Sequence, residues 1–109
     1  MKKALYLVLK NVEKAYETLE ELKNKGYNGT LVGSNSLRHT LQSFPEEHHF
    51  LNLRHISDIN NSESILCIFV WEENIIEEIK EEIRKYTNNF KDIKGFMYST
   101  TLDDYEGSN

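Results

Sequence analysis

Residues 64–83 read SILCIFVWEENIIEEIKEEI, and this stretch decides the fold. Its first part, residues 64–71, is an apolar run of strand length, which favours a buried strand. The part that follows has isoleucines at helical spacing, and it begins with acidic residues, which suit the positive end of a helix. We interpret the remaining acidic residues as a solvated helix face and not as paired catalytic carboxylates. The stretch therefore predicts a strand followed by a helix.

The sequence downstream of this unit predicts one more strand. Residues 94–101, KGFMYSTT, are β-prone, and strand alternation places Phe96 and Tyr98 on the same face. Residues 102–109, LDDYEGSN, form an acidic tail beyond this strand.

The sequence upstream repeats the pattern of strand, helix and strand. Residues 3–10, KALYLVLK, are an apolar run of strand length. Asn11 can cap a helix whose apolar stripe continues until Gly26, a residue type that commonly ends helices. Residues 27–34, YNGTLVGS, predict a second strand, whose two glycines mark places where a backbone or a ligand approaches closely.

Two such halves predict an α+β fold of the ferredoxin-like βαββαβ type. In this arrangement a four-stranded antiparallel sheet carries both helices on one face. We expect a single domain over residues 1–101, with the acidic tail at 102–109. A long insertion, from about residue 35 to 63, lies between the second and third strands. A connection of this length is typically functional, partly structured or mobile.

Composition limits the possible functions. The chain has 109 residues, of which 39% are hydrophobic, so it has room for one small core, and we expect a homo-oligomer that buries further surface. A net charge of −5 argues against a general nucleic-acid binder. The single cysteine, Cys67, lies in an apolar run and predicts a buried, inert thiol. The apolar runs are too short to span a membrane, and no signal region opens the chain, so we expect a cytoplasmic protein.

The insertion has an unusual set of basic residues. Residues 26–79 contain no lysine, yet they hold all four histidines and two of the three arginines. The segments NSLRH (35–39) and LNLRH (51–55) each place an arginine beside a histidine. Arginine offers a planar fork of donors to phosphate or carboxylate, and histidine can add a donor or stack on a base. The arginines and histidines of both segments could converge on one anion; these residues are Arg38, His39, Arg54 and His55. Alternatively, the arginines pair with nearby acidic residues and hold the insertion in place.

Metal binding and catalysis are weaker interpretations of the same region. In EEHH (46–49) the adjacent histidines would point to opposite faces of a strand, and no spacing places two ligands on one side. We therefore expect no metal site and no cofactor. The sequence also lacks a nucleophile–base arrangement, a P-loop and a G-x-G-x-x-G motif, so we expect no catalytic residues and no enzyme activity.

Several stretches resemble the PII signal-transduction superfamily, in particular its cyclic-di-AMP-receptor branch. The resemblance covers the order of elements over residues 4–100, the KGY turn (25–27), the stretch GYNGTLVGSNSLRHT, and SILCIFVWEENIIEEIKEEI. It implies a homotrimer that binds a nucleotide in clefts between subunits and moves a long loop in response. The ligand contacts that it implies are Thr30, Gly33, Ser34, Asn35 and Arg38. The turn reads SNS where that branch is richer in glycine, and the phosphate loop and basic residues of ATP-binding members are absent, which leaves the ligand's identity open.

The sequence thus predicts a PII-like regulatory protein that binds a small anionic ligand, such as a nucleotide, at subunit interfaces. The insertion would report binding to a downstream protein that the sequence does not identify. Two alternatives stay open: a homo-oligomeric interaction module without a ligand, and a metal-binding trimer like the CutA proteins, which share the topology.

Overall fold

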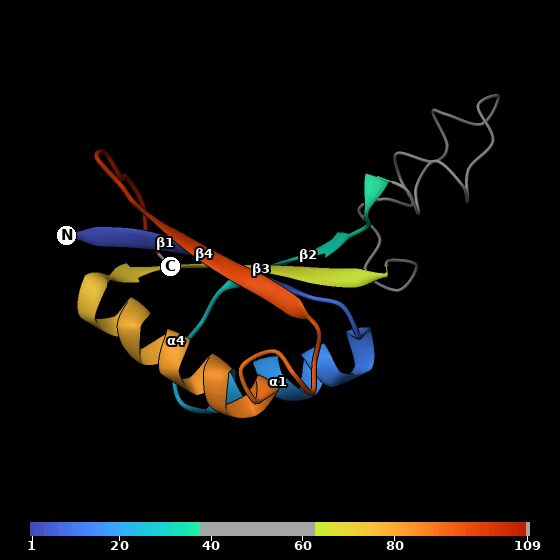
Figure 1. Cartoon of the computed structure of the whole chain (residues 1–109). Coiled ribbons are helices and arrows are strands. Elements are labelled where there is room, and N and C mark those ends of the chain that lie inside the picture. The colour runs from blue at the N-terminus through green and yellow to red at the C-terminus, as the bar shows by residue number, and fades with distance from the viewer. Residues whose placement is uncertain (38–62, 109) are drawn as a thin grey trace, which may run out of the picture.

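The computed structural model describes residues 1–37 and 63–108. Its elements follow the predicted order (Figure 1), and they are β1 (Lys2–Leu9), α1 (Val12–Asn24), β2 (Thr30–Ser34), β3 (Ser64–Glu72), α4 (Glu73–Thr87) and β4 (Gly95–Thr101). Neither helix is long and apolar enough to cross a membrane within the part of the chain that the structure describes.

The four strands form one antiparallel sheet in the order β2-β3-β1-β4. Both helices lie on the same face of this sheet (Figure 1). This is the ferredoxin-like arrangement, and the predicted fold class is confirmed. The two central strands, β1 and β3, are neighbours although a helix, a strand and the long insertion separate them in the sequence.

The core fills the space between the sheet and the helices. Alternate residues of the central strands face the helices, because successive side chains of a strand point to opposite sides. Leu7 thus lies opposite Cys67 on one side and Met97 on the other. The largest of the fully buried core side chains are Leu5, Leu7, Leu9, Leu22, Ile65, Phe69, Ile76, Ile79 and Ile83.

The first helix starts and ends as the sequence predicts, but the strand after it is shorter. Asn11 caps α1 by accepting a hydrogen bond from the amide of Lys14 at 3.0 Å. Gly26, with a φ of +91°, follows the C-terminal end of the helix. The predicted strand over 27–34 begins instead at Thr30. The reason is that the amide of Tyr27 still bonds to the carbonyl of Leu22, so this residue belongs to the turn that closes the helix.

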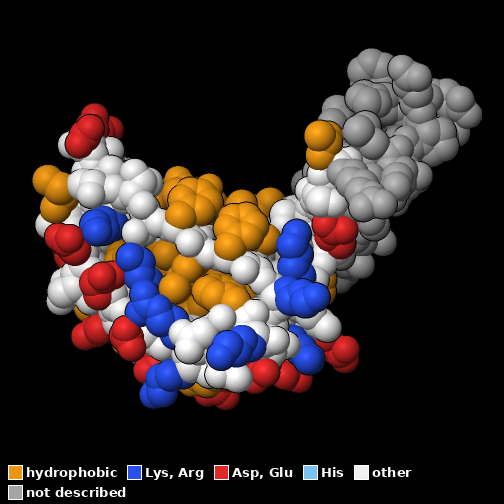
Figure 2. Space-filling view, viewed as in Figure 1, with side chains coloured by type: hydrophobic (Ala, Val, Ile, Leu, Met, Phe, Trp, Pro, Cys, Tyr) orange, Lys and Arg blue, Asp and Glu red, His pale blue; other side chains and the backbone are white. Residues whose placement is uncertain are grey.

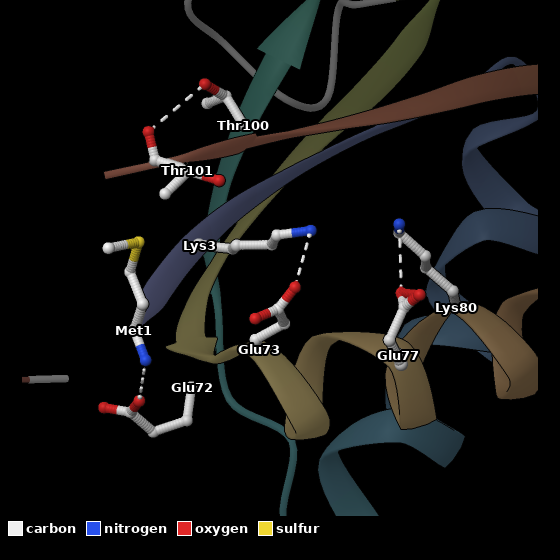
Figure 3. Close-up of polar contacts among 8 residues, drawn as sticks. All are labelled: Met1, Lys3, Glu72, Glu73, Glu77, Lys80, Thr100 and Thr101. Carbon is white, nitrogen blue, oxygen red and sulfur yellow. Dashed lines mark hydrogen bonds and ion pairs between the residues drawn. The ribbon is translucent and has the colours of Figure 1, made fainter. Parts of the chain in front are cut away.

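Ion pairs join the start of the chain to the junction of β3 and α4 (Figure 3). The terminal amine of Met1 lies 3.1 Å from a carboxylate oxygen of Glu72, and Lys3 lies 3.3 Å from Glu73. The amine hydrogen bond lowers the pKa of Glu72. Because at least one partner of each pair is more than half exposed, each pair stabilises the fold only slightly.

The opposite face of the sheet is not covered by a helix, and we call it the open face. It carries two rows of paired residues, Ile68–Tyr6–Tyr98 and Leu66–Val8–Phe96. The rings of Tyr6 and Tyr98 stack with their centroids 5.0 Å apart. Figure 2 shows hydrophobic side chains along this upper side of the body. Phe96 and Tyr98, which are 50% and 56% exposed, lie on the same face as predicted.

Candidate functional site

Four of the predicted ligand contacts lie on or directly after β2, an edge strand of the sheet. Thr30 pairs with Ile68, so its side chain lies on the open face. Ser34 lies four residues further on and has the same orientation. Gly33 pairs with Ile65, a core residue, and therefore faces the helices. The structure thus brings Thr30 and Ser34 to one face and Gly33 to the other.

The hydroxyl of Ser34 is engaged by the neighbouring strand. Its Oγ lies 2.6 Å from the Oγ of Ser64, and the Ser64 hydroxyl donates to the carbonyl oxygen of Ser34 at 3.0 Å. Because a hydroxyl has one proton, Ser34 is the donor in the contact between the two hydroxyls. Ser64 is almost fully buried. This pair fixes the end of β2 against the start of β3.

Asn35 and Glu63 hold the two ends of the insertion together. The side-chain oxygen of Asn35 accepts the amide of Glu63 at 2.8 Å, and the Glu63 carboxylate accepts the amide of Ser36 at 2.8 Å. Lys10 lies 3.9 Å from the same carboxylate. Asn35 therefore has a structural role that the sequence did not reveal, and its contact with a ligand stays a prediction.

The other predicted contacts, Arg38, His39, Arg54 and His55, lie outside the described residues. Their convergence on one anion stays a prediction. The EEHH cluster at 46–49 also lies outside them. Across residues 1–37 and 63–108, no group of three histidine, cysteine, aspartate or glutamate side chains could hold a metal ion.

Thr30 borders a hollow on the open face. This hollow has a volume of about 170 Å³ and is lined by Asn28, Gly29, Thr30, Ile68 and Val70. The threonine hydroxyl is a polar group on an otherwise apolar surface formed by the two β3 residues. Such a combination can orient a ligand, but the hollow is shallow unless another molecule closes it.

A larger hollow lies on the other side of β2, between this strand and α1, and the sequence did not indicate it. Its volume is about 240 Å³, and its α1 residues include Tyr16, Glu20 and Lys23. The signal that could have revealed it is the glycine of YNGTLVGS at position 29, which also lines this hollow.

Cys67 is 3% exposed, as the sequence predicts for a buried thiol. Burial raises its pKa from an ordinary value of 9.0 to about 12. The folded protein therefore keeps this proton at a pH where the unfolded chain has lost it. The contribution of the Cys67 thiol to the free energy of unfolding is constant below about pH 9, and it declines as the pH rises from there towards about 12.

We expect the free energy of unfolding to fall more steeply with pH in the wild type than in Cys67→Ala. One pH unit of differential protonation corresponds to about 1.4 kcal/mol, so the wild type should lose about 2 kcal/mol relative to the variant between about pH 9 and about pH 10.5. Urea unfolding across this range measures the difference. Lys25 and Tyr27 also have raised pKa values, but they titrate in both proteins, so their contributions cancel when the two curves are compared. Parallel curves would mean that the thiol is not buried.

Comparisons with known proteins support the fold alone. No family model matches the chain, and no curated protein matches it. The chain is similar to the crystal structure of a functionally unknown protein from Pediococcus pentosaceus ATCC 25745. The two share 12% sequence identity with a TM-score of 0.59, and the match covers 99% of each chain. At this identity the likeness defines a class, a ferredoxin-like α+β protein, and assigns no function.

Proposed function

We propose that the protein is a PII-like regulatory protein without catalytic activity. It assembles as a cytoplasmic homotrimer and binds a small anionic ligand, such as a nucleotide, in clefts between subunits. The segment from residue 35 to 63 responds to the ligand and presents the result to a partner protein.

One observation carries this proposal: the apolar face that no helix covers adjoins an edge strand that carries a hydroxyl group. Phe96 and Tyr98 are half-exposed on the open face, as expected for a surface that a neighbouring subunit buries. Thr30 lies at the opposite edge of this face, beside the hollow that it lines. A neighbouring subunit seated on the open face would close this hollow and convert it into a cleft.

The paired ends of the insertion support the same proposal. The segment leaves β2 and returns to β3 at one point, because Asn35 and Glu63 are bonded across its base. A ligand held by Thr30 on β2 and by Arg38 just beyond the described part of the chain would therefore contact both the sheet and the insertion. Contacts of this kind couple the binding of a ligand to the position of a loop.

We expect thermal melting against a panel of nucleotides, cyclic dinucleotides and dicarboxylates to identify one anion that stabilises the wild type. At a hundredfold excess over its Kd, such a ligand adds about 2.7 kcal/mol, which raises the Tm by about 10 °C in a domain of this size. Arg38→Ala should abolish the shift. Thr30→Val removes one hydroxyl at constant shape, and it should weaken binding roughly five- to tenfold.

Thr100→Val is the matched control, because Thr100 is exposed on the opposite edge strand, β4. This variant should bind like the wild type. Size-exclusion chromatography should show the same assembly for all three variants. A shift with divalent metal alone would instead favour the CutA-like alternative. The absence of any shift, with an intact oligomer, would contradict the proposal and favour an interaction module without a ligand.

A further inference from the structure

The hollow between α1 and β2 arises from the spacing of residues on the helix. Tyr16, Leu19, Glu20 and Lys23 recur at intervals of three and four, so they share one face of α1. All four line the hollow. Leu19 belongs to the buried stripe that also contains Ala15 and Leu22, whereas the other three residues are exposed beside it.

The floor of the hollow is apolar and comes from the sheet. Leu31 of β2 and Cys67 and Phe69 of β3 line it, together with Gly29. A Cβ atom on Gly29 would lie 2.9 Å from the sulfur of Cys67 and 3.0 Å from a ring carbon of Phe69. A side chain at this position would therefore collide with the floor and with the carbonyl oxygen of Ile68, 2.9 Å away. Glycine lets this part of the chain lie close against β3, which agrees with the close approach that the sequence motif indicates.

The rim of the hollow carries two charges of opposite sign. Glu20 and Lys23 are exposed, and within the described residues neither forms an ion pair. On α4, by contrast, the charges pair three residues apart, as in Arg84 with Glu81 at 2.6 Å. The hydroxyl of Tyr27, which also lines the hollow, is already bonded to Glu78 at 3.2 Å. Among the charged side chains that line the hollow, those without an ion pair in the described residues are thus one carboxylate and one ammonium.

The volume limits the size of an occupant. An apolar cavity of about 150 Å³ is large enough for benzene. At about 240 Å³, this hollow has room for one ring or branched alkyl group with a short polar head. It is too small for a nucleotide, so it is not the site suggested above.

We propose that the hollow binds a free α-amino acid with an apolar side chain. The side chain enters between α1 and β2 and rests on Cys67 and Phe69. The ammonium group of the ligand contacts Glu20, and its carboxylate contacts Lys23. A zwitterion with an apolar body complements an apolar floor and a rim that offers both charges.

Trp71 provides a direct signal for this binding. It is the sole tryptophan of the chain, and its indole nitrogen donates to the carbonyl of Asn28 at 3.0 Å. Asn28 lines the hollow, so a ligand there should change the fluorescence of Trp71. Titration with L-phenylalanine and L-leucine should give saturable changes at millimolar concentrations or below, with calorimetry as a second readout.

Two truncated probes and two pairs of variants test the assignment. Phenethylamine lacks the carboxylate and 3-phenylpropionate lacks the ammonium, and each should bind roughly tenfold more weakly than L-phenylalanine. Glu20→Gln and Lys23→Met should produce losses of the same order. Their matched controls are Glu13→Gln and Lys14→Met, which lie on the first turn of the same helix and away from the hollow.

The outcome is independent of the anion site. Thr30→Val should leave the binding of L-phenylalanine unchanged, because its side chain lies on the other face of the sheet. The proposal would be overturned if neither amino acid bound at millimolar concentration. It would also be overturned if the truncated probes bound as well as L-phenylalanine, or if the rim variants behaved like their controls.

Discussion

Gly95→Ala should lower the free energy of unfolding by about 3 kcal/mol or more. Gly95 begins β4 and pairs with Leu9 of the central strand β1. A Cβ atom at this position would overlap the carbonyl oxygen of Val8 and lie 3.0 Å from its carbonyl carbon. These are backbone atoms of a strand bonded on both sides, so they cannot move aside as a flexible side chain would.

Urea unfolding measures this effect, with the intrinsic fluorescence of Trp71 as the signal. Ser99→Ala is the matched control, because Ser99 lies on the same strand and pairs with Leu5. It faces the same side of the sheet as Gly95, and it should change stability only slightly. A loss below about 1 kcal/mol for Gly95→Ala would show that β4 begins later or pairs in another register with β1.

The elements of this fold were predictable because each has a local signal. The apolar run at 64–71 and the helical stripe after it identify β3 and α4 without information from elsewhere. Asn11 marks the start of α1 through a bond to an amide three residues away. The strand predicted over 27–34 was too long because the amide of Tyr27 still closes the helix at Leu22, and because the next residue takes part in a tertiary contact. The carbonyl of Asn28 accepts the indole of Trp71, a residue distant in the sequence.

The candidate sites were predictable only in part. Strand alternation is enough to place Thr30 and Ser34 on one face of β2 and Gly33 on the other. The role of Asn35 could not be predicted, because it depends on Glu63 at the far end of a long insertion. The hollow under β2 depends likewise on Gly29 lying against Cys67 and Phe69. The predicted fold makes β2 and β3 neighbours, but it does not give the register that sets Gly29 against these two side chains.

Replacing both exposed aromatic residues of the open face by lysine should convert the expected homotrimer into monomers. Phe96 and Tyr98 are 50% and 56% exposed in the isolated subunit, yet they belong to rows that are apolar across β3, β1 and β4. Large aromatic side chains at the centre of an interface each contribute about 2 kcal/mol or more to association. Losing both should weaken assembly about a thousandfold, and unpaired charges buried in their place should weaken it further.

Sedimentation of Phe96→Lys/Tyr98→Lys over a range of concentrations tests this expectation. Tyr16→Lys is the matched control, since Tyr16 is a comparably exposed aromatic residue, at 43%, but lies on α1 in the helical layer. The control should assemble like the wild type. Because the two replaced side chains are half in water already, the double variant should remain folded as a monomer. If it stayed trimeric, the subunits would have to meet elsewhere, and the open face could not form the cleft that Thr30 is proposed to share.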